Sequence, residues 1–294
     1  MTLRARTSEI PAAGPRPAVL AVLGWAVLAL LAGLGAGCKS GEAAVDPILR
    51  LSAEESLARG RELMADEKYA RARDFLNHAF EVSPNSVEGR EALLLVADCY
   101  YLDGGRANYI QAEAKYRDFL NRFPTSERAP YVQFQIANSL AQRIGRPDRD
   151  LRATHDALEA FLDLLRLYPT SEYAAQAREK IRLVEENLAE HEYIVGDFYL
   201  RYRLPRAAAE RFEYLLENYP AYSEKEKVLF KLGLAQARGR QPVQARETFE
   251  RLAREFPDSP YLSRLPALPE PGEEDAEAEA EEDDAGGDDQ EASG

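Results

Sequence analysis

The chain has 294 residues, and its 51 acidic and 37 basic side chains give a formal net charge of −14. Nearly all of this charge lies in residues 270–294, which contain thirteen acids and no base. The remainder is close to neutral and has no segment of concentrated basic side chains, so the composition argues against nucleic-acid binding.

The first 37 residues have the composition of a bacterial secretory leader. Residues 1–16 carry three arginines and one acid, and the stretch from Pro17 to Cys38 has no charged side chain. Leu34-Gly35-Ala36-Gly37-Cys38 resembles the bacterial lipobox, in which small residues precede a lipidated cysteine, although its leucine lies one position further away than usual. This resemblance implies a signal peptide over residues 1–37 and lipidation of Cys38.

The apolar stretch of the leader is long enough to leave an alternative open, in which it stays in place as a membrane-anchoring helix. Lys39 follows the cysteine, whereas the bacterial signal for retention in the inner membrane is an aspartate there, so we expect delivery to the outer membrane. With Cys38 acylated, Cys99 has no disulfide partner, and its apolar surroundings predict a buried thiol. Residues 38–51 are expected to form the lipidated N-terminus and a linker.

Ser52-Ala53-Glu54-Glu55 has the pattern of a capping box and predicts the start of the first helix. Helical periodicity then continues to about residue 265, without sustained strand alternation. Within this stretch a small residue, a bulky apolar residue and a proline recur five times, at offsets of four and then eight. The five sets are Ala72/Leu76/Pro84, Ala112/Tyr116/Pro124, Ala157/Phe161/Pro169, Ala208/Phe212/Pro220 and Ala245/Phe249/Pro257.

Self-similarity at this period predicts stacked helical hairpins, because one such unit is too small to bury its apolar face alone. Gly60, Gly196 and Gly233 each lie twelve residues before the alanine of their repeat. We interpret them as facing that alanine across the hairpin so that two backbones nearly touch, with Ala97 and Ala137 in the same role in repeats two and three. The pattern looks like the tetratricopeptide repeat and predicts an all-α solenoid of five such hairpins over residues 52–265.

Ten helices are expected in this domain, with turns near residues 66, 84, 104, 124, 146, 169, 204, 220, 240 and 257. The fourth repeat is longer than the others, and its extra residues follow a helical stripe from Tyr173 to Leu188. We therefore expect an unusually long helix before Arg203, with Gly196 as the position for a break.

The first helix of each tetratricopeptide-like hairpin lines the inner surface of the solenoid. Counting from the small residues places several aromatic and polar side chains there, namely Arg61, Met64, Tyr101, Tyr131, Phe134, Asn138, Tyr193, Asp197 and Phe230. They predict a groove for an extended peptide with apolar or aromatic side chains. The alternative is that these rings pack between the repeats.

No catalytic or cofactor-binding motif is found in the sequence. The three histidines, His78, His155 and His191, lack metal-ligand spacing, and no phosphate loop, nucleophile elbow or dinucleotide fingerprint is present. We therefore expect neither an enzyme, a cofactor nor a metal site. The tail, residues 266–294, has too little apolar surface to fold and is expected to be disordered.

The later repeats also resemble a known family. Residues 188–193 (Leu-Ala-Glu-His-Glu-Tyr), 206–211 (Arg-Ala-Ala-Ala-Glu-Arg) and 217–220 (Glu-Asn-Tyr-Pro) are similar to the BamD family, the lipoprotein subunits of the outer-membrane β-barrel assembly complex. Residues 123–126 and 167–171 fit the middle repeats of that family, and the acidic tail has no counterpart there.

The resemblance implies a lipid-anchored, non-catalytic scaffold on the periplasmic face of the outer membrane. Its implied partners are the periplasmic domains of the barrel-forming subunit, with Arg211 at that contact, and unfolded outer-membrane proteins near the earlier repeats. A general periplasmic repeat lipoprotein that organises cell-wall or division proteins is the alternative.

Overall fold

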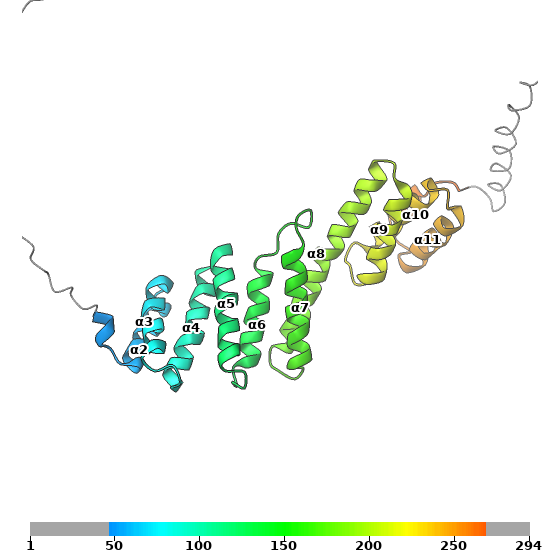
Figure 1. Cartoon of the computed structure of the whole chain (residues 1–294). Helices are drawn as coiled ribbons and strands as arrows, with labels where there is room; N and C mark the ends of the chain where they lie inside the picture. The colour runs from blue at the N-terminus through cyan, green and yellow to red at the C-terminus, as the bar shows by residue number, and fades with distance from the viewer. Residues whose placement is uncertain (1–46, 269–294) are drawn as a thin grey trace, which may run out of the picture. The chain divides into compact units, whose positions relative to one another are not determined.

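Figure 1 shows the computed structural model of the chain, which describes residues 47–268. The predicted signal peptide, Cys38 and nearly all of the acidic tail lie outside the described residues. Within residues 47–268 the chain forms ten α-helices, two short 3-10 helices and no strand. In chain order the elements are η1 (Pro47–Arg50), α2 (Ala53–Ala65), α3 (Tyr69–Val82), α4 (Val87–Asp103), α5 (Arg106–Arg122), α6 (Ala129–Ala141), α7 (Arg152–Leu167), α8 (Ala174–Arg201), α9 (Pro205–Asn218), α10 (Lys225–Arg238), α11 (Pro242–Glu255) and η2 (Leu262–Arg264).

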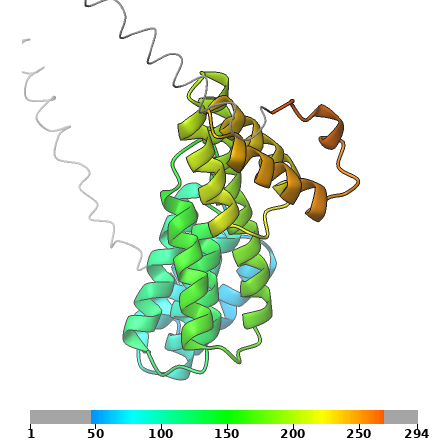
Figure 2. The same ribbon diagram turned by 90° about the vertical axis from the view of Figure 1, so that its right-hand side faces the viewer.

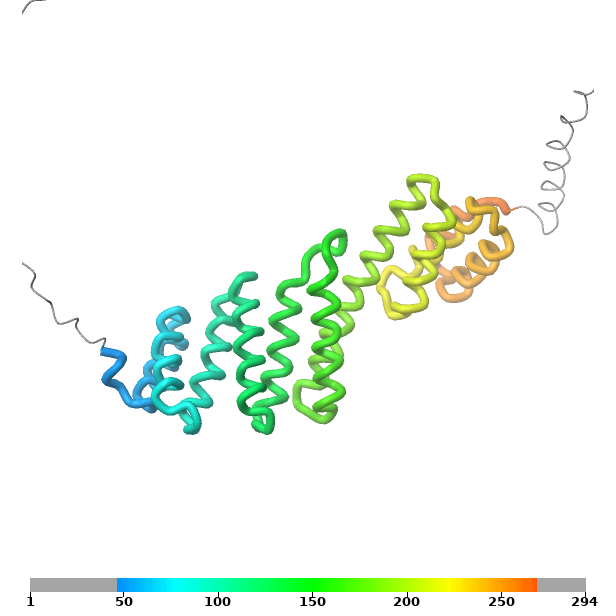
Figure 3. Tube along the Cα trace, in the orientation of Figure 1, coloured from blue at the N-terminus to red at the C-terminus, as the bar shows by residue number. Residues whose placement is uncertain are grey.

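The ten α-helices belong to one compact unit that begins at Leu51, and they pack as five consecutive hairpins. The hairpins are α2–α3, α4–α5, α6–α7, α8–α9 and α10–α11, and the second helix of each contacts the first helix of the next. This succession can be followed in the ribbon of Figure 2 and along the tube of Figure 3. The prediction of an all-α solenoid of five hairpins is confirmed, and the predicted turns fall between the observed helices.

The sequence signals for helix starts and ends coincide with helix boundaries in the structure. Ser52 and Glu55 form the capping box of α2, in which the Glu55 amide donates to Ser52 Oγ at 3.2 Å and the Ser52 amide donates to Glu55 Oε2 at 2.8 Å. Each of the helices α3, α5, α7, α9 and α11 ends two residues before its proline. The residue between them has φ from −126° to −145° and ψ from 59° to 70°, outside the helical region that a following proline disfavours.

The contacts of the three repeat glycines differ from the predicted backbone-to-backbone approach. A Cβ added at Gly196 would lie 2.6 Å from Cε1 of Phe212, and one added at Gly60 would lie 2.5 Å from Cδ2 of Leu76. Gly233 meets Phe249 in the same way. The glycine therefore receives the bulky side chain that follows the alanine, because that side chain projects across the hairpin, and it does not serve mainly to bring two backbones together.

Helix α8 runs for 28 residues without a break, so the expectation of an interruption at Gly196 was wrong. The ring of Phe212 fills the notch at Gly196 and packs the helix on that side. The first half of α8 contributes Ala177, Ile181 and Val184 to a core formed with α4 to α7, and the second half contributes Ala189, Tyr193 and Leu200 to a core formed with α9 to α11. A third core lies between α2, α3 and α4.

Candidate functional site

Most of the predicted peptide groove is occupied by packing between the hairpins. Phe134, Asn138 and Tyr193 are 7%, 8% and 9% exposed. The Phe134 ring stacks on Tyr173 with a centroid separation of 5.2 Å and also contacts Phe161. These three side chains are therefore part of the interior, which corrects the expectation that they line an open groove. Aromatic side chains at helical spacing pack against the next hairpin here.

Tyr131 belongs to a hydrogen-bonded chain that joins α4, α5 and α6. Its hydroxyl donates to Asp98 Oδ1 at 2.7 Å, and the Tyr116 hydroxyl donates to the same oxygen at 2.6 Å. Gln135 donates to the Tyr131 hydroxyl, and Asn138 donates to Gln135. Burial raises the pKa of Asp98 despite the two hydroxyl donors. The arrangement fixes the register of three helices and leaves Tyr131 only partly exposed.

The other predicted groove positions also have partners within the fold. Tyr101 is partly exposed and packs on Tyr109 at 5.7 Å between ring centroids. Arg61 pairs with Glu91, and Met64 packs at the edge of the core between α2, α3 and α4. Phe230 is buried and stacks on Tyr261. Of this set, Tyr101 and Tyr131 keep aromatic surface that a partner could reach.

A cleft that the sequence did not suggest lies beside the second hairpin. Its volume is about 660 Å³, and it is formed by α4, the end of α5 and the turn before α6. Apolar and arginine side chains alternate along its wall, among them Val87, Arg90, Leu94, Leu95, Phe119, Arg122, Phe123 and Arg128. Val87 is 64% exposed. The guanidinium carbon of Arg90 lies 5.9 Å from the centre of the Phe123 ring, and that of Arg128 lies 5.3 Å from the centre of the Tyr131 ring. Such a wall suits an extended chain with apolar side chains and carboxylates.

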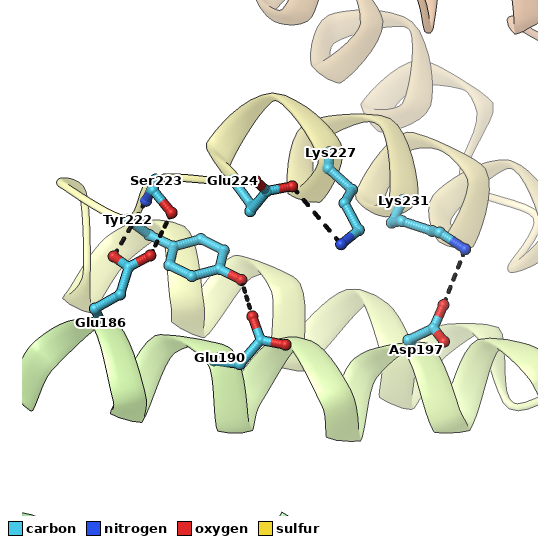
Figure 4. A network of polar contacts seen from close by, with 8 residues as sticks. All are labelled: Glu186, Glu190, Asp197, Tyr222, Ser223, Glu224, Lys227 and Lys231. Atoms are coloured by element: carbon cyan, nitrogen blue, oxygen red, sulfur yellow. Dashed lines mark hydrogen bonds and ion pairs between the residues drawn. The ribbon is translucent and has the colours of Figure 1, made fainter. Parts of the chain in front are cut away.

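The last two hairpins are held together by the polar face of α8, shown in Figure 4. Glu186 accepts hydrogen bonds from the amide and the hydroxyl of Ser223, and Glu190 accepts one from the hydroxyl of Tyr222. Two turns further along α8, Asp197 pairs with Lys231 at 2.9 Å. The predicted groove residue Asp197 therefore positions α10 against α8.

Arg211 lies on α9 and points to the surface of the fourth hairpin. It pairs with Glu192 of α8 at 3.2 Å, and 45% of its side chain is exposed, against 13% for Glu192. Tyr214, one turn along α9, is 46% exposed and packs edge-on against Tyr219. Arginine and tyrosine are the residue types that most often dominate protein interfaces, so this face of α9 has the composition of a docking site.

The described residues show neither a membrane-spanning helix nor a cluster of metal ligands. No helix between residues 47 and 268 combines the length and the hydrophobicity that crossing a membrane requires. In the same range no three His, Cys, Asp or Glu side chains gather around a point where a metal could bind. Two histidines hold loops: His191 Nδ1 donates to the Pro147 carbonyl at 2.6 Å, and His78 Nε2 to the Leu51 carbonyl at 3.1 Å.

Comparison with known families agrees with this architecture. The family model described as outer membrane lipoprotein, YfiO, matches residues 51–239, and a tetratricopeptide repeat model matches residues 227–259. The first match spans more than half of the chain and four of the five hairpins. The chain belongs to this outer-membrane lipoprotein family.

Curated members of the family are similar in sequence across the repeats. The outer membrane protein assembly factor BamD of Caulobacter vibrioides is 30% identical over 54% of this chain and 51% of its own length. BamD of Rickettsia prowazekii is 29% identical over 67% of this chain and 76% of its own length. The chain thus spans about half of the first relative and three quarters of the second. Among solved structures, the TPR2AB domain of yeast Sti1 matches with 14% identity, a TM-score of 0.40, and coverage of 70% of this chain and 78% of the other.

Proposed function

We propose that this chain is a lipid-anchored subunit of the outer-membrane β-barrel assembly complex and serves it as a non-catalytic scaffold. The observation that carries the proposal is the family match over residues 51–239. The role that names its relatives, outer membrane protein assembly, is assigned to this chain on that basis. Cys38 is the proposed lipidated residue, which attaches the repeats to the periplasmic face of the outer membrane.

The exposed face of α9 is the proposed contact with the periplasmic domains of the barrel-forming subunit. Arg211 keeps 45% of its side chain exposed beside its ion pair with Glu192, and Tyr214 adds an exposed ring one turn away. Arg211→Glu should weaken the complex with that subunit at least fivefold, because it replaces an interface cation by an anion.

Arg166→Glu is the matched control for this test. Arg166 lies near the end of α7, is 70% exposed and forms one ion pair with Asp163 at 2.7 Å, so it shares the chemistry of Arg211 at a different place. Co-purification from detergent-solubilised envelopes measures both variants. An unchanged complex with Arg211→Glu, or equal losses with both, would remove Arg211 from the interface. Recovery of cell-wall or division proteins in place of assembly subunits would favour the alternative adaptor function.

The cleft beside the second hairpin is the proposed site for unfolded outer-membrane proteins. Its exposed Val87 and its arginines fit an extended segment with apolar and acidic groups. Val87→Asp should reduce binding of a fluorescent peptide of that composition several-fold, because it places a charge on the apolar wall. Val243→Asp, on α11, alters a valine of similar exposure, 55%, and should leave binding unchanged. Equal binding by the natural chain and Val87→Asp contradicts the assignment.

A further inference from the structure

Two neighbouring turns bring six arginines to one end of the last two hairpins. Residues 198–209 surround the α8–α9 turn and contain Arg201, Arg203 and Arg206 without an acid. Residues 232–246 surround the α10–α11 turn and contain Arg238, Arg240 and Arg246, again without an acid. The turns touch, since Arg206 Nε donates to the Gly239 carbonyl at 3.5 Å. We name the six arginines the arginine surface.

Few acids of the described residues pair with Arg201, Arg203, Arg206 or Arg238. Arg201 pairs with Asp197 at 3.1 Å, but the other oxygen of that carboxylate binds Lys231. Among the described residues the structure gives Arg203, Arg206 and Arg238 no ion pair. Arg201, Arg203 and Arg238 line a pocket of about 500 Å³ together with Leu200 and Pro205. The pocket is therefore open to an anionic group.

The described part of the chain ends close to this surface. After η2 the backbone turns back along α11, where Leu265, Pro266 and Leu268 line a shallow pocket with Arg246, Phe249, Glu250 and Ala253. Arg246 lies in the second turn of α11, six residues after Arg240 in the preceding turn. At about 3.3–3.6 Å per extended residue, a segment of 25 residues is long enough to reach both turns.

We propose that the acidic segment 270–294 binds the arginine surface of its own chain. The segment carries thirteen acids and no base, and Arg246 of the arginine surface lines a pocket with Leu265, Pro266 and Leu268, which come directly before it in the chain. Carboxylates and guanidinium groups pair well because one planar fork matches the other. Because most of these arginines are exposed, the contact is weak, reversible and sensitive to salt. The segment covers the surface until a stronger anionic partner displaces it.

The test adds a dye-labelled peptide of residues 270–294 to two forms of the full-length chain and follows its fluorescence anisotropy. One form has the natural tail, and the other has every Glu and Asp of residues 270–294 changed to Gln or Asn. The amide-tail form should bind the peptide at least tenfold more tightly, because no internal segment competes. Raising the salt from about 0.05 to 0.3 M should remove most of that binding.

Charge reversal in the amide-tail form tests where the peptide binds. Arg203→Glu with Arg238→Glu should reduce its affinity at least fivefold. Arg178→Glu with Arg182→Glu is the matched control: it makes the same charge change on the first half of α8, where both arginines are exposed, and should leave the affinity within twofold.

Two results overturn the proposal. One is equal peptide affinity for the natural and the amide-tail chains. The other concerns lipid: both chains are floated with phosphatidylglycerol vesicles. If they bind the vesicles equally through Arg203 and Arg238, and excess peptide does not compete, the surface serves a lipid headgroup and not the tail. Vesicle binding by the amide-tail chain alone, or competition by the peptide, supports the proposal.

Discussion

Gly196 offers a test of how each hairpin of this solenoid is packed. In an exposed helix, replacing glycine by alanine raises stability by about 1 kcal/mol. In α8 the new Cβ would lie 2.6 Å from Cε1 and 2.9 Å from Cδ1 and Cζ of Phe212, whose side chain is fully buried and has no room to move. Overpacking of this kind costs about 1–3 kcal/mol. We therefore expect Gly196→Ala to lower the free energy of unfolding by about 1–2 kcal/mol, although alanine has a higher helix propensity than glycine.

A double-mutant cycle separates the two effects. Phe212→Val removes every atom that the added Cβ would meet, at the cost of a cavity. In that background Gly196→Ala should become neutral or stabilising, which gives a coupling free energy of about 2 kcal/mol. Urea unfolding followed by circular dichroism measures all four proteins. Additivity within about 0.5 kcal/mol, or a stabilised single variant, would refute the account of the glycine notch.

Four further predictions concern buried or strained groups. Asp98→Ala should lower the free energy of unfolding by about 2–3 kcal/mol, since the hydroxyls of the buried Tyr116 and the partly buried Tyr131 lose their acceptor. The surface control Asp118→Ala should cost under about 0.5 kcal/mol. Burial in the fold raises the pKa of Asp98 above its ordinary value of 3.8. The protonated carboxyl group therefore contributes its full stabilisation below pH 3.8, and this stabilisation is lost as the pH rises through the pKa of the folded state. Asp98→Asn should remove this part of the pH dependence of unfolding. Burial raises the pKa of Cys99 to about 12, and a thiol reagent at neutral pH should label it only after unfolding. Glu67 adopts φ 59° in the α2–α3 turn, and Glu67→Gly should raise the melting temperature by relieving about 1 kcal/mol of backbone strain.

The fold was predictable because its determinants are local and repeated. A proline ends a helix through the geometry of the residue before it, so Pro124 or Pro220 marks a boundary without knowledge of the partner helices. The alanine-to-aromatic spacing marks one buried face in the same way. Gly196 was harder to interpret, because the sequence places a glycine opposite the alanine but does not show that the side chain of Phe212 reaches across.

The candidate surfaces were less predictable, because exposure depends on what the neighbouring hairpin contributes. Phe134 and Asn138 fall on the expected helix face, yet Tyr173 and Gln135 cover them there. The cleft beside the second hairpin combines α4 with a turn about 30 residues later. The arginine surface is similar: Arg203 and Arg238 are 35 residues apart, and no local charge pattern reveals that their turns touch.

The uninterrupted α8 has a practical consequence for any attempt to divide the polypeptide. Because its two halves belong to different cores, a protease cut or a gene truncation inside this helix exposes hydrophobic side chains on both fragments. These are Ile181 and Val184 on one fragment and Tyr193 and Leu200 on the other. Neither fragment ends in a helix whose outer face is polar, as the terminal repeat of a solenoid requires. The last two hairpins should therefore be lost or retained with the preceding ones, and the region should melt as a unit.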